Sequence, residues 1–136
     1  MNTPSIQYAI KLVNFFVTSV NMGPIDPNDK KLTESLQVNI GFGLGFNEDK
    51  LNNYLVNFNI DITNKNKSFR LELKASALFE STSNIDDDFK NSTFVQTNSP
   101  AIAFPFIRSF INTLTTNAGI NPVILPAFNF SKQEKE

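Results

Sequence analysis

Residues 36–46 read LQVNIGFGLGF, and every second residue of this stretch is apolar while the residues between are polar or glycine. Such alternation places the apolar side chains on one face of a β-strand, which is the pattern of a half-buried strand. Residues 54–62 and 69–79 alternate in the same way, and the short polar turns 47–50 and 64–67 separate the three stretches. Short turns between alternating strands predict an antiparallel β-meander.

Residues 6–20 predict a further strand, in which the apolar phase slips by one residue between Leu12 and Val13. A slip of one residue moves the following side chains to the other face unless the strand bulges, so we expect a β-bulge or bend there. A connection rich in turn-forming residues, 21–29, leads from this strand to the meander. The sequence therefore predicts a four-stranded antiparallel sheet in a single domain.

A long helix is expected over residues 104–117, with Pro105 in its first turn and Gly119 and Pro122 as stop signals. At 100° per residue its apolar side chains cover an arc of about 200°, although packing on one layer needs little more than about 100°. A second subunit could cover the excess, or the excess could be a binding surface. We assign four residues to an oligomer interface: Ile107, Phe110, Ile111 and Leu114.

Composition argues against several classes of protein. The 136 residues contain no Cys and no His, which removes the commonest nucleophile, proton-transfer and metal-binding side chains. A net charge of −1 gives no basic excess for a nucleic-acid backbone. The run Asp86-Asp87-Asp88 lacks the ligand spacing of a calcium loop, and residues 41–45 lack the spacing of a phosphate loop. We therefore expect no enzyme activity, no cofactor and no metal.

The sequence contains no apolar run of the roughly 18 residues that would span a bilayer, and its first residues lack the positive charge of a signal peptide. We expect a cytoplasmic protein without membrane insertion. Residues 1–130 are expected to form the domain, and residues 131–136 to be a disordered tail.

Two stretches, FPFIRSFI at residues 104–111 and PVILPAFNF at residues 122–130, resemble the SecB family of bacterial export chaperones. The strand 69–79, with Glu72, is also similar to the third strand of that family. The resemblance implies an α+β fold, in which a four-stranded antiparallel β-meander packs on one long helix, and assembly as a dimer of dimers. This sequence stops shortly after Phe130, so the second C-terminal helix of the family is expected to be missing.

The resemblance implies a chaperone that holds non-native polypeptide in apolar grooves without ATP. A dedicated antitoxin chaperone of a toxin–antitoxin–chaperone module, of the phage-defence type, is an alternative. A non-catalytic structural or adaptor subunit is another, and all three readings imply a homo-oligomer, with a tetramer expected from the family. The client-binding candidates are aromatic or aliphatic residues near the helix and tail: Ile85, Phe104, Phe106, Phe128 and Phe130.

A partner-docking face is expected on the strand 69–79, where Arg70, Glu72 and Lys74 share one side. The family docks the export ATPase SecA on an acidic sheet face with carboxylates on its first and third strands. Here the matching first-strand positions, Asn14 and Thr18, are neutral, and Glu72 stands between two cations. We therefore expect a local field closer to positive than negative and weak or absent SecA docking.

Overall fold

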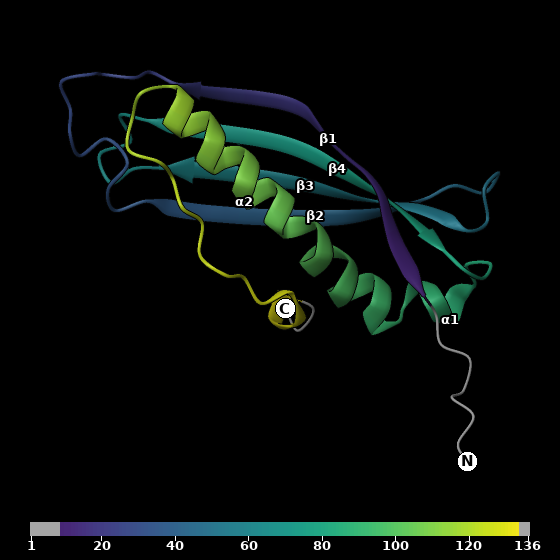
Figure 1. Cartoon of the computed structure of the whole chain (residues 1–136). Coiled ribbons are helices and arrows are strands. Elements are labelled where there is room, and N and C mark those ends of the chain that lie inside the picture. The colour runs from purple at the N-terminus through teal and green to yellow at the C-terminus, as the bar shows by residue number, and fades with distance from the viewer. Residues whose placement is uncertain (1–8, 134–136) are drawn as a thin grey trace, which may run out of the picture.

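The computed structural model describes residues 9–133, which form a four-stranded antiparallel sheet with a long helix across one face (Figure 1). The predicted α+β architecture is confirmed. The strands and the long helix are β1 (Ile10–Gly23), β2 (Gln37–Phe46), β3 (Asn53–Thr63), β4 (Arg70–Ser81) and α2 (Ser99–Asn117).

The strand order is β1-β4-β3-β2. Meander order therefore holds for β2, β3 and β4, as predicted, whereas β1 pairs with β4 and not with the strand that follows it in sequence. The connection after β1 consequently runs past one end of the sheet to reach the opposite edge (Figure 1). Local alternation could not reveal this, because it identifies strands but not their distant partners.

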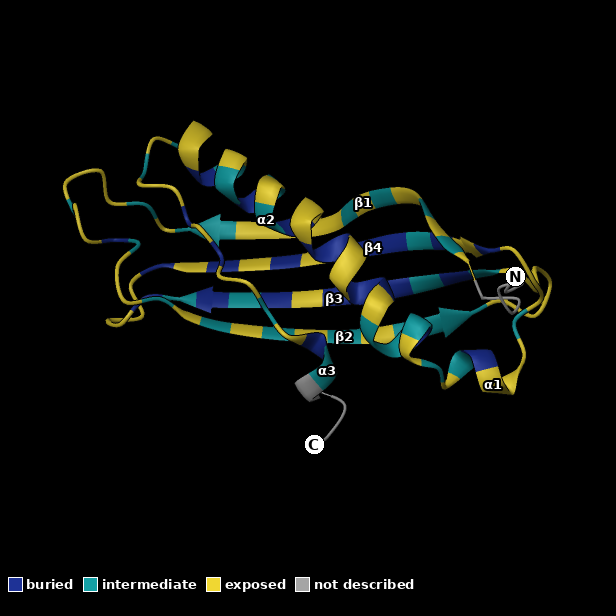
Figure 2. Ribbon diagram, turned by 60° about the horizontal axis from the view of Figure 1, so that its bottom comes forward, coloured by how far each residue is buried: buried dark blue, intermediate teal, exposed yellow. Residues whose placement is uncertain are grey.

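The register explains the alternation in the sequence. β2 pairs with β3 without interruption from Gln37↔Thr63 to Phe46↔Tyr54, and β3 pairs with β4 in the same way. Buried and exposed residues consequently alternate along the strands, with the buried set facing α2 (Figure 2). Side chains of β3 and β4 supply most of the sheet side of the core: Tyr54, Val56, Phe58, Ile60, Ile62, Leu71, Leu73, Ala75, Ala77 and Phe79.

β1 contains two irregularities, between Leu12 and Asn14 and between Val17 and Ser19. The first is the predicted phase slip, and the second was not predicted. Each adds one residue to β1 relative to β4, so that apolar side chains on both sides of the bulges can reach the helix-facing side. β1 is also an edge strand, which is where bulges are commonest.

α2 begins at Ser99, earlier than predicted, so Pro105 lies inside the helix and not in its first turn. Pro100 occupies the first turn in its place, where its missing N–H costs no hydrogen bond. The segment before α2 forms a short helix α1 (Asp87–Lys90) and a π-helical turn η1 (Phe94–Asn98). The carboxylate of Asp86 caps α1 by accepting the N–H of Phe89 at 2.8 Å.

The last described part of the chain returns along α2 on its β2 side and ends in a short helix, α3 (Phe130–Gln133) (Figures 1 and 2). The helix α3 includes residues expected in the disordered tail, and the remainder of that tail, residues 134–136, lies outside the described residues. None of the helices within residues 9–133 is long and apolar enough to cross a membrane.

Candidate functional site

Five phenylalanine rings meet where α2, β2, β3 and the C-terminal segment come together, and we call this group the aromatic cluster: Phe42, Phe58, Phe104, Phe128 and Phe130. Phe130 lies at its centre. Its ring centroid is 4.8 Å from that of Phe128, 5.4 Å from Phe104, 5.5 Å from Phe42 and 6.3 Å from Phe58. Edge-to-face pairs at these separations are favourable beyond the burial of area.

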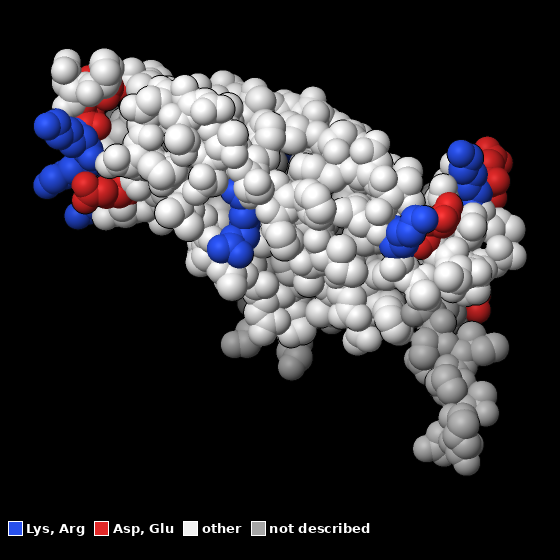
Figure 3. Space-filling model, in the orientation of Figure 1, with Lys and Arg blue, Asp and Glu red and all other residues white. Residues whose placement is uncertain are grey.

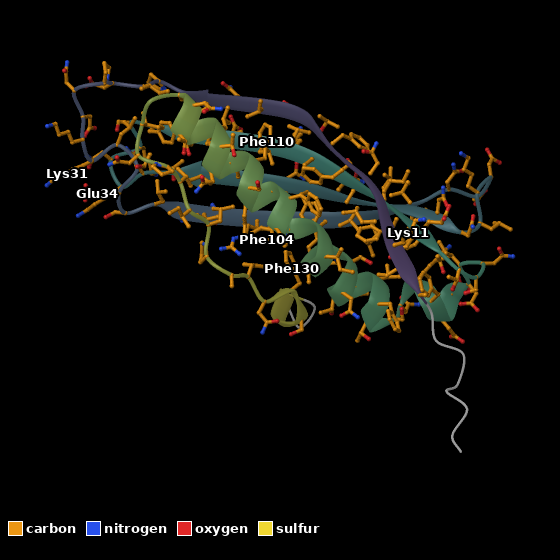
Figure 4. The ribbon with its side chains drawn as sticks, in the orientation of Figure 1. Lys11, Lys31, Glu34, Phe104, Phe110 and Phe130 are labelled. Atoms are coloured by element: carbon orange, nitrogen blue, oxygen red, sulfur yellow. The ribbon has the colours of Figure 1, made fainter. Side chains whose placement is uncertain are left out.

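The predicted client-binding residues lie at separate places in the structure. Phe104 and Phe130 are only 4% and 2% exposed, so both belong to the core of the chain in this state. Phe104 of α2 lies against Phe130 of the C-terminal segment, as Figure 4 shows. Phe106 is 48% exposed and packs on Phe15 of β1, with ring centroids 5.7 Å apart. Positions 104 and 106 are about 200° apart around a helix, which explains the separation.

Ile85 lies in another hollow, beyond the end of β2. Its backbone N–H donates to the carbonyl of Leu51 at 2.7 Å, and Phe46 and Lys90 line the same hollow. The ammonium group of Lys90 lies 5.0 Å from the centre of the Phe46 ring, within the range of a cation–π contact. The hollow thus combines the apolar side chains of Phe46, Leu51 and Ile85 with polar and charged ones, and it is distinct from the aromatic cluster.

Residues 122–129, which we call the strap, lie extended between α2 and the β2 side of the sheet. Val123 and Leu125 are 1% exposed, whereas Ile124 between them is 70% exposed. Two side chains of α2 hold its backbone. The hydroxyl of Thr115 accepts the N–H of Val123 at 2.9 Å, and Nε of Arg108 donates to the carbonyl of Leu125 at 3.0 Å.

The apolar arc of α2 consists of two parallel rows. Ala103, Ile107 and Ile111 are 0% exposed and pack on the sheet, so Ile107 and Ile111 are core residues and their assignment to an oligomer interface is revised. A neighbouring row at every fourth position remains partly exposed: Ile102, Phe106, Phe110 and Leu114. We call it the α2 stripe. Figure 4 shows Phe110 on the helix, away from Phe104 and Phe130.

The α2 stripe lies near β1, whose Val20 is exposed on the helix-facing side, opposite Leu73. Arg108 is the one charged residue in the sequence of α2, and its Nε is bound to the strap. On the face seen in Figure 3, charged side chains gather mainly at the two ends, with uncharged side chains between them. Part of this apolar row stays exposed in the single chain, and exposed apolar surface of this kind indicates a contact surface.

The opposite, outward face of the sheet carries the predicted docking residues, and here the charge balance differs from the prediction. Nε and Nη2 of Arg70 donate to the two carboxylate oxygens of Asp61 at 2.9 and 2.8 Å. This bidentate hydrogen bonding lowers the pKa of Asp61 below its ordinary value. Arg70 also lies 3.4 Å from a carboxylate oxygen of Glu72. Two carboxylates thus face Arg70 and Lys74, so the local field is balanced and not positive.

Sequence reasoning missed Asp61 because it considered one strand at a time. Asp61 lies directly opposite Glu72 in the β3–β4 register, and directly opposite residues share a face. On β1, the residue opposite Glu72 is Asn21, and the hydroxyl of Thr18 donates to the backbone carbonyl of Lys74 at 3.1 Å. The two β1 residues that lie near these charges, Thr18 and Asn21, are neutral.

The titratable group most affected by burial is a tyrosine. Burial raises the pKa of Tyr54 to about 12, and a hydrogen bond to the hydroxyl of Ser99, at 2.5 Å, opposes that rise. Tyr54 is therefore neutral at physiological pH and links β3 to the start of α2. Within residues 9–133, no three His, Cys, Asp or Glu side chains lie close enough together to hold a metal ion.

Residues 7–133 match the family model described as preprotein translocase subunit SecB. The chain belongs to the SecB family. The protein-export protein SecB of Rickettsia akari is 33% identical over 99 residues, which are 71% of this chain and 60% of that protein. The uncharacterized protein MJ0357 of Methanocaldococcus jannaschii is 31% identical over 128 residues, covering 89% of this chain and 79% of that protein.

Solved structures show the same fold at low sequence identity. The SecB-like chaperone Rv1957 of Mycobacterium tuberculosis, in complex with a ChAD peptide from the antitoxin HigA1, superposes with a TM-score of 0.69 at 10% identity and 88% coverage of each chain. A protein of unknown function from Streptococcus agalactiae gives a TM-score of 0.55 at 11% identity, covering 89% of this chain and 99% of that one. The SecB-like fold is thereby confirmed.

Proposed function

We propose that this chain is an ATP-independent chaperone that binds apolar segments of non-native polypeptide. The observation that carries the proposal is a second apolar surface within a SecB family fold. After the core is complete, Phe42 and Phe128 of the aromatic cluster and Phe106 and Phe110 of the α2 stripe are still partly exposed. Apolar surface of this kind binds unfolded chains because they expose apolar side chains that folded proteins bury.

The client site in this proposal lies between α2 and β2, at the place that Phe130 occupies in this structure. Phe42, Phe58 and Phe104 surround Phe130 there, and the half-buried Phe128 lies at the edge. The hollow around Ile85 provides a second apolar contact further along the same side of the sheet. A client at this site meets few charged side chains, which suits apolar segments. In this proposal the chaperone acts in the cytoplasm, before its clients are exported or assembled.

The α2 stripe serves a different purpose in this proposal, which is assembly of the homo-oligomer. Its regular spacing at every fourth residue is the geometry of a ridge that packs against another helix. β1 beside it is an edge strand with exposed apolar residues, so a second copy could cover both elements together. A tetramer, arranged as a dimer of dimers, would bury the stripes of all copies.

A dedicated antitoxin chaperone is the second candidate. It is favoured by the similarity in fold to Rv1957, which was solved with an antitoxin peptide bound. An adaptor subunit, which would hold folded partners and no unfolded chain, is the alternative from another class. The two chaperone readings differ in client range, and both differ from the adaptor in requiring affinity for non-native polypeptide.

Suppression of aggregation tests the proposal. A chemically denatured model protein is diluted into buffer without nucleotide, with the parent chain or with Phe42→Ser, which removes one aromatic wall. We expect the parent to slow aggregation and Phe42→Ser to lose most of this effect. Ile124→Ser is the matched control, because Ile124 is apolar but points to solvent.

Three outcomes separate the candidates. Suppression with several unrelated denatured proteins supports the general chaperone. Suppression confined to one partner segment supports the antitoxin chaperone. A parent chain that is folded and leaves every aggregation rate unchanged, while a folded partner co-purifies with it, contradicts the proposal and supports the adaptor.

A further inference from the structure

We propose that the strap and Phe130 are a built-in occupant of the client groove, which an extended client segment of the same apolar spacing displaces. The inference rests on the proposed function and deepens it, since it names the pattern of residues that the groove selects. It also assigns a regulatory role to a segment of the chain itself.

The strap is bound in the way that an extended peptide is bound. Val123 and Leu125 point inward, Ile124 points to solvent, and the inward pattern continues at the half-buried Phe128 and the buried Phe130. Inward residues therefore follow one another at intervals of two, three and two positions (123, 125, 128, 130). Two aliphatic side chains of the extended strap are followed by two aromatic ones, of which Phe128 belongs to the strap and Phe130 is the first residue of α3.

The backbone of the strap is held by contacts that almost any polypeptide can make. The hydroxyl of Thr115 accepts a hydrogen bond from the N–H of Val123, and Arg108 donates one to the carbonyl of Leu125. Neither hydrogen bond involves a strap side chain. Within residues 9–133, the backbone of residues 122–128 makes no hydrogen bond to the backbone of the sheet or of α2. Pro122 and Pro126 lack an N–H, which excludes regular pairing with β2.

The strap is consequently not a fifth strand of the sheet. It is fixed by two hydrogen bonds and by side chains placed in apolar pockets, while ordering its backbone has an entropic cost. Segments with few backbone partners open at a lower free energy than the core does. In this proposal the strap leaves while the sheet and α2 stay folded, at the cost of exposing Val123 and Leu125.

Departure of Phe130 would uncover the surface that a client needs. The rings of Phe42, Phe58 and Phe104 all contact Phe130. These three rings would stay in place without Phe130, because β2, β3 and α2 hold them. A client aromatic residue would replace Phe130, and an aliphatic residue five to seven positions earlier would replace Val123 or Leu125. The groove thus selects apolar-x-apolar-x-x-aromatic-x-aromatic segments without a charge at these four positions.

A synthetic peptide of residues 121–131 (NPVILPAFNFS), labelled with a fluorophore, tests the inference in trans. The intact chain with Phe130→Ala has a weakened strap but unchanged Thr115, Arg108 and ring walls. We expect it to bind the peptide about tenfold more tightly than the parent or better, because the fraction of open grooves rises. Ile124→Ser, which changes an exposed strap residue, should bind the peptide as the parent does.

Locking the strap in place is the opposite of weakening it with Phe130→Ala. This second test changes no core residue, so it does not depend on whether a core variant folds. Asn112 and Ile124 line the same groove between α2 and the strap, and the chain has no native cysteine. Asn112→Cys with Ile124→Cys, joined by a short bis-maleimide, should lose peptide binding. Each single cysteine variant, treated with the same reagent, should keep it. Hydrogen exchange of the parent should show faster exchange of the strap amides when peptide is added.

Equal peptide affinity in the parent, the Phe130→Ala and the locked chain would overturn the inference, as would unchanged strap exchange. If the locked chain still suppresses aggregation of denatured proteins as the parent does, the strap inference fails and the proposed function stands. If no form suppresses aggregation, the proposed function itself fails, whatever the peptide does.

Discussion

Replacing Phe106 by Asp should dissociate the proposed homo-oligomer without unfolding the protomer. Phe106 is 48% exposed in the single chain and belongs to the α2 stripe, so about half of its surface remains for a second copy to cover. Complete burial of a Phe side chain contributes about 1.5–3 kcal/mol, so the remaining half contributes roughly 1 kcal/mol from each copy. An unpaired carboxylate in the same contact costs several kcal/mol more.

The two terms together raise the dissociation constant by at least about a thousandfold, because each 1.4 kcal/mol is a factor of ten. Light scattering after size-exclusion chromatography at micromolar concentration measures the change, and thermal unfolding shows whether the protomer is intact. Thr113→Asp is the matched control, since Thr113 is exposed on α2 but outside the α2 stripe. A parent chain that is monomeric, or a Phe106→Asp variant that assembles like the parent, would refute the reasoning.

Two further changes test other contacts. Titration with SecA at physiological salt should show weak or no binding, because the outward sheet face is electrically balanced; sub-micromolar binding that Glu72→Lys abolishes would contradict this expectation. Thr115→Val should lower the free energy of unfolding by about 1–3 kcal/mol, because a buried backbone N–H loses its acceptor. Thr116→Val, whose hydroxyl donates to Asn112 at 2.7 Å on the exposed side, should cost less in the same denaturant titration.

Most of the sheet could be predicted from sequence because period-two alternation is a local property. Residues 36–46 and 54–62 determine which face of each strand is buried, and the structure confirms both. The place of β1 beside β4 depends on pairing between distant segments, which alternation does not specify. The start of α2 was placed too late because Pro105 resembles a first-turn proline as much as Pro100 does.

The candidate site was harder to predict than the fold. The excess apolar arc of α2 is visible in the sequence, but its division into a buried row and the α2 stripe depends on how the helix is rotated against the sheet. Ile107 and Phe110 looked equivalent for this reason, although one is core and the other partly exposed. Phe130 looked like an exposed aromatic, and its burial depends on the return of the strap along α2.

The central claim is that non-native polypeptide binds in the groove between α2 and β2. The most direct measurement is amide NMR of the labelled chain during titration with a permanently unfolded protein, such as a reduced and carboxymethylated one, without nucleotide. We predict that chemical shifts change along Phe42 and Phe58, on Phe104 and through the strap, while those around Arg70 and Lys74 stay constant. Changes confined to the outward sheet face, or none at saturating client, would contradict the account.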